Sequence, residues 1–408
     1  MKLRNLMYAT MIACAFASCS KDDVIDNGPD AKGDASLTIK IDTKGTKAVG
    51  SGDATINELA VFLYKVDENG TKTLAGNQYV DSYTTDGMIV FNDLTAGDKY
   101  MCVGFANLGD VSVEQAAGTS PLGLTISSEL YGSNDIPMHG VSGEVEIPTT
   151  SSVEAVIQLT RDLAKVELTA VSLNMNYTTD EGRFGDYTSG TAKFKFNAAY
   201  VNSAIQSGSY TYSNTGTYSY ALPETPVYVG GLADWSWVKT AGSNALSNSA
   251  VVGYSVTGDA SLAEATQTIG TPKADATEAE KAKYAAQSVA IPSANNESTV
   301  IFYVLPNENE NKTTLTLEGT MQLINATTAT QSNINNTVKG YYNITIGEDA
   351  SVAEGFSYDG TGVHANDYFK ISAIVVGTGS GKGGDKPSLV VKTQVKAWNA
   401  ISQVTPVK

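Results

Sequence analysis

Few residues in this chain of 408 stand at a spacing that could support catalysis or cofactor binding. Residues 379–384 match the GxGxxG pattern of nucleotide-binding loops, but such a loop must open a helix. Here Pro387 and an apolar, strand-like segment follow, so a hairpin loop is predicted instead. The segment is not a Walker loop either, because Gly383 rather than Ser or Thr follows Lys382.

The titratable residues do not form a recognisable site. His139 and His364 are the two histidines of the chain and lie far apart in the sequence, which argues against a His-centred triad or a zinc site. Acidic pairs such as Glu144 and Glu146 are common among 43 acidic residues and are typical of solvated faces rather than of a catalytic dyad. We therefore expect no enzyme activity, no metal and no cofactor.

Residues 1–18 combine a basic start, an apolar centre and a run of small residues, which is typical of a secretory signal peptide. They are too few for a spanning helix. The residues around Cys19 resemble a bacterial lipobox, in which cleavage leaves this cysteine as a lipidated N-terminus. An ordinary signal peptide with an incidental cysteine is the alternative. Cys14 lies within the signal and Cys102 is left alone, so no intramolecular disulfide is predicted.

The balance of charge argues against a nucleic-acid partner. The chain has 27 basic and 43 acidic residues, a net charge of −16 at pH 7. Seven of the basic and six of the acidic residues lie within the first 47, so the 361 residues that follow carry a net charge of −17. Such an acidic surface repels phosphate backbones. Residues 20–35 are polar and rich in Asp and Gly, as expected for a flexible tether.

The first strand of the fold is predicted at residues 36–42, where Leu37, Ile39 and Ile41 alternate with polar residues. A small, basic segment follows at once, and a protease of trypsin-like specificity could cut it after Lys44 or Lys47. A strand that can be cut away leaves a groove in the sheet, and another strand could enter that groove.

Beyond residue 48 the chain is predicted to be almost wholly β, because short apolar segments alternate with turns rich in Gly, Asn, Asp and Ser. This pattern predicts β-sandwiches. Strands are expected at residues 56–66, 87–91, 100–107, 153–159, 163–168, 298–306, 313–324, 340–346, 368–376, 388–398 and 400–407. Residues 100–107 are apolar on both faces and should form a central strand. Capping boxes that begin at Ser112 and Thr277 predict two short helices, ending near residues 118 and 286.

Segments at five places resemble the fimbrillins, the major subunits of type V pili in the family of major fimbrial subunit lipoproteins. They are the lipobox at Cys19, the pair Lys47-Ala48, residues 104–107 with 136–140, residues 159–166, and residues 392–398. They run from end to end of the chain, although the Tyr-rich middle shows no match. The family's best-known members have Arg at the cleavage point, so Lys47 implies a protease of different or broader specificity.

The resemblance implies an all-β fold of two tandem Greek-key, transthyretin-like β-sandwich domains with one or two short helices. Residues 1–18 would be the signal peptide. Residues 19–47 would form a propeptide that contains the lipid tether and the removable first strand. Residues 48–158 would be the N-terminal sandwich, and residues 159–408 the C-terminal sandwich with a candidate donor strand.

It also implies a structural subunit of a cell-surface fimbria that supports adhesion. The lipoprotein would reach the outer membrane, lose everything through about Lys47, and accept a C-terminal strand of another subunit in the open groove. Which of two C-terminal strands enters the partner stays open; the candidate donor residues are Leu389, Val391, Val395, Trp398, Ile401, Val404 and Val407. The implied partners are other copies of the chain, anchor and tip subunits, and ligands on host or bacterial surfaces.

An aromatic-rich middle supports a different function. Aromatic side chains there could stack on sugar rings in a surface glycan-binding lipoprotein that keeps its lipid anchor; they are Tyr210, Tyr212, Tyr218, Tyr220, Tyr228, Trp235 and Trp237. Aromatic residues also fill and decorate ordinary β-sheets, and we favour that interpretation. The two candidate cut sites, together with the C-terminal strands, favour a shaft subunit of a fimbria.

Overall fold

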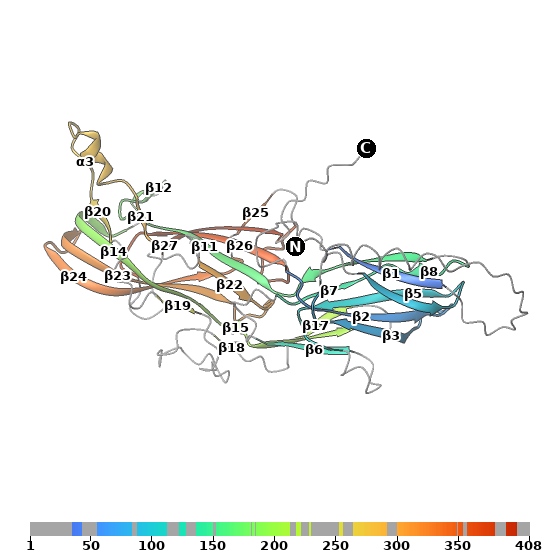
Figure 1. The fold of residues 1–408 in the computed structure, drawn as a ribbon. Coiled ribbons are helices and arrows are strands. Elements are labelled where there is room, and N and C mark those ends of the chain that lie inside the picture. Colours follow the sequence, from blue (N-terminus) through green and yellow to red (C-terminus); the bar gives the residue numbers. More distant parts are fainter. Residues whose placement is uncertain are drawn as a thin grey trace, which may run out of the picture.

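Alternating apolar residues form strands throughout the chain, and in the computed structural model these strands build two β-sandwiches that lie end to end (Figure 1). The structure describes residues 35–42, 55–83, 88–111, 122–127, 136–149, 152–180, 182–183, 185–212, 218–221, 228–229, 253–255, 264–291, 300–348, 350–353, 357–379 and 389–397. No helix in these ranges is long and apolar enough to cross a membrane.

The first sandwich packs a small sheet of order β4-β1-β9 on a larger sheet of order β10-β7-β5-β2-β3, with β8 paired to β5. Its strands are β1 Ala35–Asp42, β2 Leu59–Val66, β3 Lys72–Val80, β4 Ile89–Leu94, β5 Lys99–Ala106, β7 Met138–Val141, β8 Val145–Glu146, β9 Val153–Gln158 and β10 Thr160–Arg161. Strand β5 is buried at every position after Lys99, which confirms the predicted central strand.

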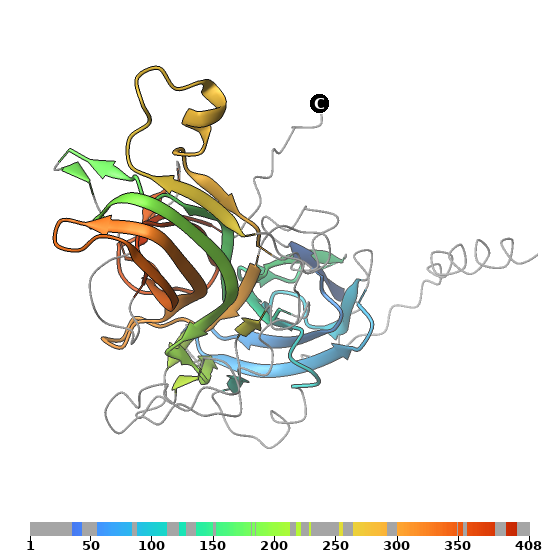
Figure 2. The ribbon, with the colours of Figure 1, turned by 90° about the vertical axis from the view of Figure 1, so that its left-hand side faces the viewer.

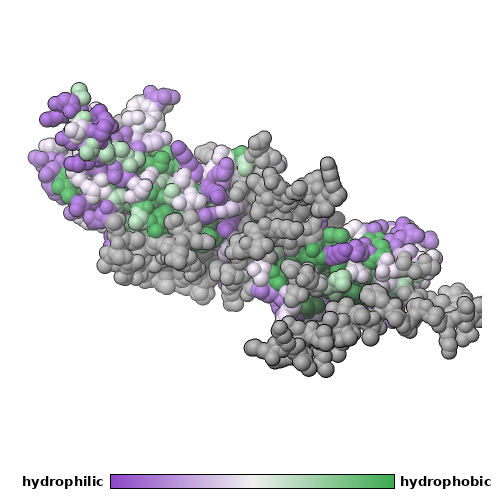
Figure 3. Space-filling model, turned by 45° about the horizontal axis from the view of Figure 1, so that its top comes forward, coloured by the Kyte–Doolittle hydropathy of each residue, from purple (hydrophilic) through white to green (hydrophobic). Residues whose placement is uncertain are grey.

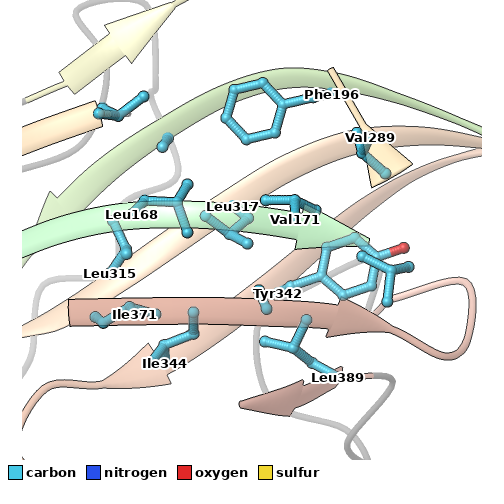
Figure 4. Packing of buried hydrophobic residues seen from close by; sticks show 14 of the residues in the cluster. Leu168, Val171, Phe196, Val289, Leu315, Leu317, Tyr342, Ile344, Ile371 and Leu389 are labelled. Carbon is cyan, nitrogen blue, oxygen red and sulfur yellow. The ribbon is translucent and has the colours of Figure 1, made fainter. Parts of the chain in front are cut away.

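The second sandwich has one sheet of order β21-β11-β26-β27-β25, with β22 paired to β11, and another of order β19-β14-β23-β24, with β20 paired to β14. Its strands are β11 Ala164–Leu173, β14 Tyr187–Asn202, β19 Gly253–Ser255, β20 Ala265–Ile269, β21 Gln287–Val289, β22 Val300–Val304, β23 Thr314–Thr328, β24 Ile334–Thr345, β25 Ser351–Val352, β26 Asp367–Val375 and β27 Leu389–Ala397. Figure 4 shows how its two sheets meet: Leu168 of β11 and Ile371 of β26 lie near Leu315 and Leu317 of β23.

Short ribbons complete the fold. They are the pair β12 Thr178–Thr179 and β13 Gly182–Arg183, the pair β15 Ala204–Ile205 and β18 Tyr228–Val229, and a sheet of order β17-β16-β6 built from β17 Tyr218–Ala221, β16 Ser207–Tyr212 and β6 Leu122–Ser127. Because β6 comes from the first half of the chain and β16 from the second, this last sheet ties the two halves together.

The two sandwiches also share a hydrophobic cluster. Phe62 and Phe105, whose ring centroids lie 5.9 Å apart, project from the larger sheet of the first sandwich. Leu163, which directly precedes β11, and Tyr303 and Leu305, in and just after β22, belong to the same cluster, and all five side chains are buried. The larger sheet is therefore covered on both faces, which explains why β5 is apolar throughout.

A short helix, α3 Glu278–Ala282, lies at the end of the second sandwich that is far from the first (Figure 1) and projects away from its sheets (Figure 2). Thr277 and Glu280 form the predicted capping box, but the helix ends at Ala282, earlier than expected. The fully buried Gln267 holds the base of this arm, because its Nε2 donates hydrogen bonds to the carbonyl oxygens of Tyr284 and Ala285 at 3.0 Å. On the face that Figure 3 shows, the described surface at this end is largely hydrophilic.

Most other sequence predictions agree with the structure, with differences of a few residues at the ends. Strands β26 and β27 pair antiparallel from Val375 opposite Leu389, so the glycine-rich segment joins the two strands of a hairpin as predicted. The 16-residue strand β14 and the strand β3 were not predicted. The helix expected after Ser112 and the strand expected at residues 400–407 lie outside the described residues.

Candidate functional site

The first strand, β1, occupies the middle of the small sheet. It pairs antiparallel with β4, where Leu37 lies opposite Phe91, and parallel with β9, where Leu37 lies opposite Val153. The parallel pairing runs for six residues, up to Asp42 opposite Gln158. Within this sheet β4 and β9 are joined through β1, so removal of β1 would leave a groove with an unpaired strand on each side.

Burial of its apolar face is the main contribution of β1 to the core. Leu37 is 0% and Ile39 is 1% exposed, whereas Ile41 is half-buried. A fully buried side chain of this size stabilises a fold by about 1.5–3 kcal/mol, so Leu37 and Ile39 together contribute about 3–6 kcal/mol. They pack in one cluster with Phe91 and Ile157 from the flanking strands.

The outer face of β1 contributes much less. Lys40 Nζ lies 2.7 Å from Glu154 Oε1 of β9, and the two side chains are 50% and 56% exposed. An ion pair this exposed is worth about 0–1 kcal/mol. Apolar burial and the two ladders of backbone hydrogen bonds therefore hold β1 in place.

The floor of the groove depends on two glycines that bring the sheets close together. A Cβ on Gly104 of β5 would lie 3.2 Å from Ile157 Cδ1, and a Cβ on Gly140 of β7 would overlap the carbonyl oxygen of Gln158. Both glycines belong to segments that the sequence singled out, and their physical role is to let β9 approach the larger sheet.

Substitution of Gly140 by Ala should therefore destabilise the first sandwich. The added methyl group meets backbone, which cannot rotate away, so the free energy of unfolding should fall by about 1–3 kcal/mol. Chemical denaturation measures the loss. Gly143→Ala is the matched control, because a Cβ at Gly143 meets nothing within 4 Å. Equal stability of the two variants would contradict this account of the groove floor.

Cys102 lies in the same core cluster as Leu37 and Ile39. It is 0% exposed, and burial raises the pKa of its thiol to about 12. Its backbone N–H donates a 2.9 Å hydrogen bond to Ser142 Oγ. A thiol in this setting is unreactive while the core is closed.

Asn107 is the last residue of another segment that carried the resemblance, residues 104–107, and its structural role can be seen in its contacts. It sits just after β5 in the left-handed conformation, with φ of 60°, which Asn tolerates better than most residues. Its Nδ2 donates hydrogen bonds to the carbonyl oxygens of Thr55 at 2.8 Å and Ile136 at 2.9 Å. Its Oδ1 accepts one from the backbone of Asn57 at 2.9 Å. The side chain thus fixes the chain just before β2 begins.

The two histidines lie in different sandwiches. His139 of β7 contacts the buried Asp162, and His364 Nδ1 lies 3.0 Å from Asp367 Oδ2. In the part of the chain that the structure describes, no group of three or more His, Cys, Asp or Glu side chains is arranged to hold a metal ion.

Several predicted site residues lie outside the described ranges, so their roles stay predictions; they are Cys19, Lys44, Lys47, Trp398, Ile401, Val404 and Val407. Three candidate donor residues, Leu389, Val391 and Val395, lie in β27, which pairs with β26 along nine residues. Leu389 is part of the home core, and Val391 packs against it.

The aromatic residues of the middle segment are spread over several places. Tyr228 is 4% exposed and belongs to the cluster between the sandwiches, so it fills a core. Tyr210 and Tyr212 lie in β16, where they pair with Tyr220 and Tyr218 of β17. Trp235 and Trp237 are outside the described residues.

No protein-family model and no curated relative matches the chain, but solved structures do. A candidate cell adhesion protein from Parabacteroides distasonis superposes with a TM-score of 0.56 at 16% identity, over 90% of this chain and 98% of that one. A fimbrilin from Porphyromonas gingivalis gives 0.51 at 16% identity, over 91% and 99%. A second candidate adhesion protein from P. distasonis gives 0.50 at 14% identity, over 91% and 99%. The chain shares their fold, which confirms at that level the resemblance predicted from the sequence.

Proposed function

We propose that the protein is a structural subunit of a cell-surface fimbria that supports adhesion. It is exported as a lipoprotein through Cys19, placed in the outer membrane, cut after Lys44 or Lys47, and polymerised by strand exchange between copies. The observation that carries this proposal is the position of β1: a buried central strand that immediately precedes the basic segment. The shared fold with a fimbrilin supports it.

Cleavage would convert a complete sandwich into one that lacks a strand. The open groove would have lost about 3–6 kcal/mol of apolar burial from Leu37 and Ile39, together with two hydrogen-bond ladders. An extended segment from another subunit restores both contributions by adding a strand between β4 and β9. Each subunit then gives a strand and receives one, and such head-to-tail contacts extend into a filament.

The donor is assigned to the segment that follows β27. Strand β27 already has a partner at home, since every residue from Leu389 to Ala397 is in register with β26. Exporting it would remove Leu389 from its own core. Trp398, Ile401, Val404 and Val407 follow and supply further apolar side chains. Accessory anchor and tip subunits would use the same groove and donor.

The substitution Leu37→Ala should lower the stability of the precursor but not that of the mature filament. In the uncut protein it should lower the free energy of unfolding by about 2–5 kcal/mol, because it opens a cavity at a fully buried position. In the cut protein residue 37 is gone, so assembled filaments should be as stable as those of wild type. Lys40→Ala is the control, with an expected change in the precursor below about 1 kcal/mol. Filaments weakened by Leu37→Ala would show that β1 stays in the mature subunit.

N-terminal sequencing of protein sheared from cells tests the proposed function. A fimbrial shaft subunit should begin at Gly45 or Ala48. A glycan-binding lipoprotein would retain acylated Cys19, and so would an anchor subunit. Recovery of the lipidated N-terminus on the sheared material would therefore contradict the assignment to the shaft.

A further inference from the structure

Two apolar side chains flank β1 on the outer face of the small sheet, the face that points away from the core. Lys40 of β1 is the register partner of Val156 in β9. On the other side of β1, Ile39 lies opposite Ile89, so the same antiparallel register brings Met88 beside Lys40. Side chains alternate between the two faces of a sheet, and Ile39 and Ile89 are buried. Met88, Lys40 and Val156 therefore form one row across the outer face.

The two ends of this row are unusually exposed for apolar residues. Met88 is 65% and Val156 is 45% exposed. Among the described residues, four large hydrophobic side chains are exposed, and the other two, Leu74 and Val352, lie on β3 and β25. A single exposed apolar side chain needs no explanation. Two that flank the same position of one strand would form a continuous apolar row if that position were apolar too.

In the precursor the position between them belongs to a charged residue. Lys40 Nζ lies 2.7 Å from Glu154 Oε1, and the side chain of Lys40 is 50% exposed. A lysine can lay its methylene groups along apolar neighbours while its ammonium group stays in water. Because Lys40 precedes both proposed cut sites, it leaves with β1, and the row then loses its middle residue.

The proposed donor segment has apolar residues on both of its faces. Ile401, Val404 and Val407 follow one another at intervals of three residues. Since side chains alternate along a strand, Val404 points away from the face that carries Ile401 and Val407. One face can fill the positions of Leu37 and Ile39 in the groove. Whichever face does so, at least one apolar side chain is left on the outside of the sheet.

We propose that Met88 and Val156 recognise the strand donated by a second copy, which places an apolar side chain between them at the position of Lys40. This inference rests on the proposed strand exchange and adds a specificity determinant on the outside of the groove. Apolar pairs across neighbouring strands stabilise a sheet, and β1 offers only the stem of a lysine at this position. The donated strand therefore gains a contact that β1 lacks, which favours exchange in the direction of assembly.

Full-length precursor tests the recognition without filaments. Lys40→Leu places an apolar side chain between Met88 and Val156, and Lys40→Ser does not. The midpoint of thermal unfolding should be at least about 2 °C higher for Lys40→Leu than for Lys40→Ser. This difference should fall by more than half when Met88 and Val156 are both replaced by Thr. An equal difference in the two backgrounds would mean that the two side chains recognise nothing at this position, and the proposal would be wrong.

Filaments grown from cut precursor test the contact between copies. Val156→Thr keeps the branched shape of the side chain but makes it polar. Its filaments should dissociate about two- to fivefold faster than wild type after dilution into denaturant, while the midpoint of the precursor stays within about 2 °C of wild type.

Leu74→Thr is the matched control, because Leu74 is 44% exposed, against 45% for Val156, but lies on β3 of the larger sheet. Its filaments should dissociate at the wild-type rate. Wild-type dissociation of the Val156→Thr filaments, or equal acceleration in the control, would overturn the proposal. If cut wild-type protein forms no filaments, the proposed function itself fails, and this inference falls with it.

Discussion

Replacing Lys44 and Lys47 by Ala should leave a folded monomer that does not polymerise. In the uncut chain β1 fills its own groove, and its short connection to β2 gives it an effective concentration of about millimolar. A donor strand from another copy would have to compete with this tethered strand. It would have to replace the two fully buried side chains of β1 and its two ladders of backbone hydrogen bonds. The uncut protein should therefore be at least as stable as the wild-type precursor.

Size-exclusion chromatography and electron microscopy measure the loss of filaments. Labelling of Cys102 with a thiol reagent reports on the groove, because this residue is buried in the cluster that contains β1. The thiol should stay protected in the uncut variant, become reactive after cleavage without a donor, and be protected again in filaments. Replacing Lys273 and Lys283 by Ala removes two exposed lysines elsewhere and should change nothing. Normal polymerisation of the uncut variant would mean that the cut lies elsewhere or is unnecessary.

Strands with a regular alternation were predictable from the sequence, and those with bulges were not. Leu37 and Ile39 keep a period of two along β1, and both are buried. Strand β14 does not keep a period of two along its whole length, because its register with β23 shifts between Phe196 and Ala198. Phe194 and Phe196 belong to the core cluster before the shift, and Ala199 and Val201 belong to it after the shift. Strand β3 lies at an edge and none of its residues is fully buried, so no apolar alternation marks it.

The candidate site was predictable in its parts but not in its arrangement. The alternation of β1 and the basic segment after it can be seen in the sequence. The pairing of β1 with β9 places Leu37 opposite Val153, which is far away in the sequence. Nothing local in either segment predicts that the two strands pair in parallel. The same limit applies to the C-terminal strands. The alternation at Leu389 and Val391 looks the same in the sequence whether the strand packs in its own subunit or in a neighbouring one. Only the fold shows that Leu389 belongs to the core of its own subunit and that Val391 packs against that core.

Removing residues 400–408 should abolish polymerisation while leaving the stability of the subunit unchanged. The home strand β27 is complete without them, since its last residue, Ala397, still pairs with Asp367. The removed segment contains Ile401, Val404 and Val407, which are too apolar for a tail without a partner. If they belong to the neighbouring subunit, the truncated protein loses its donor but keeps its own core.

Thermal unfolding and filament formation of the truncated protein together decide the matter. A lower midpoint, by roughly 2–4 °C for each kcal/mol in a domain of 150–250 residues, would mean that the segment packs at home. Persistent filaments with an unchanged midpoint would instead make β27 itself the donor, and Leu389 would then have to leave its core cluster. An Ile401→Ala variant distinguishes a specific insertion from mere chain length, because it keeps every residue of the segment but should weaken filaments through the loss of one buried side chain.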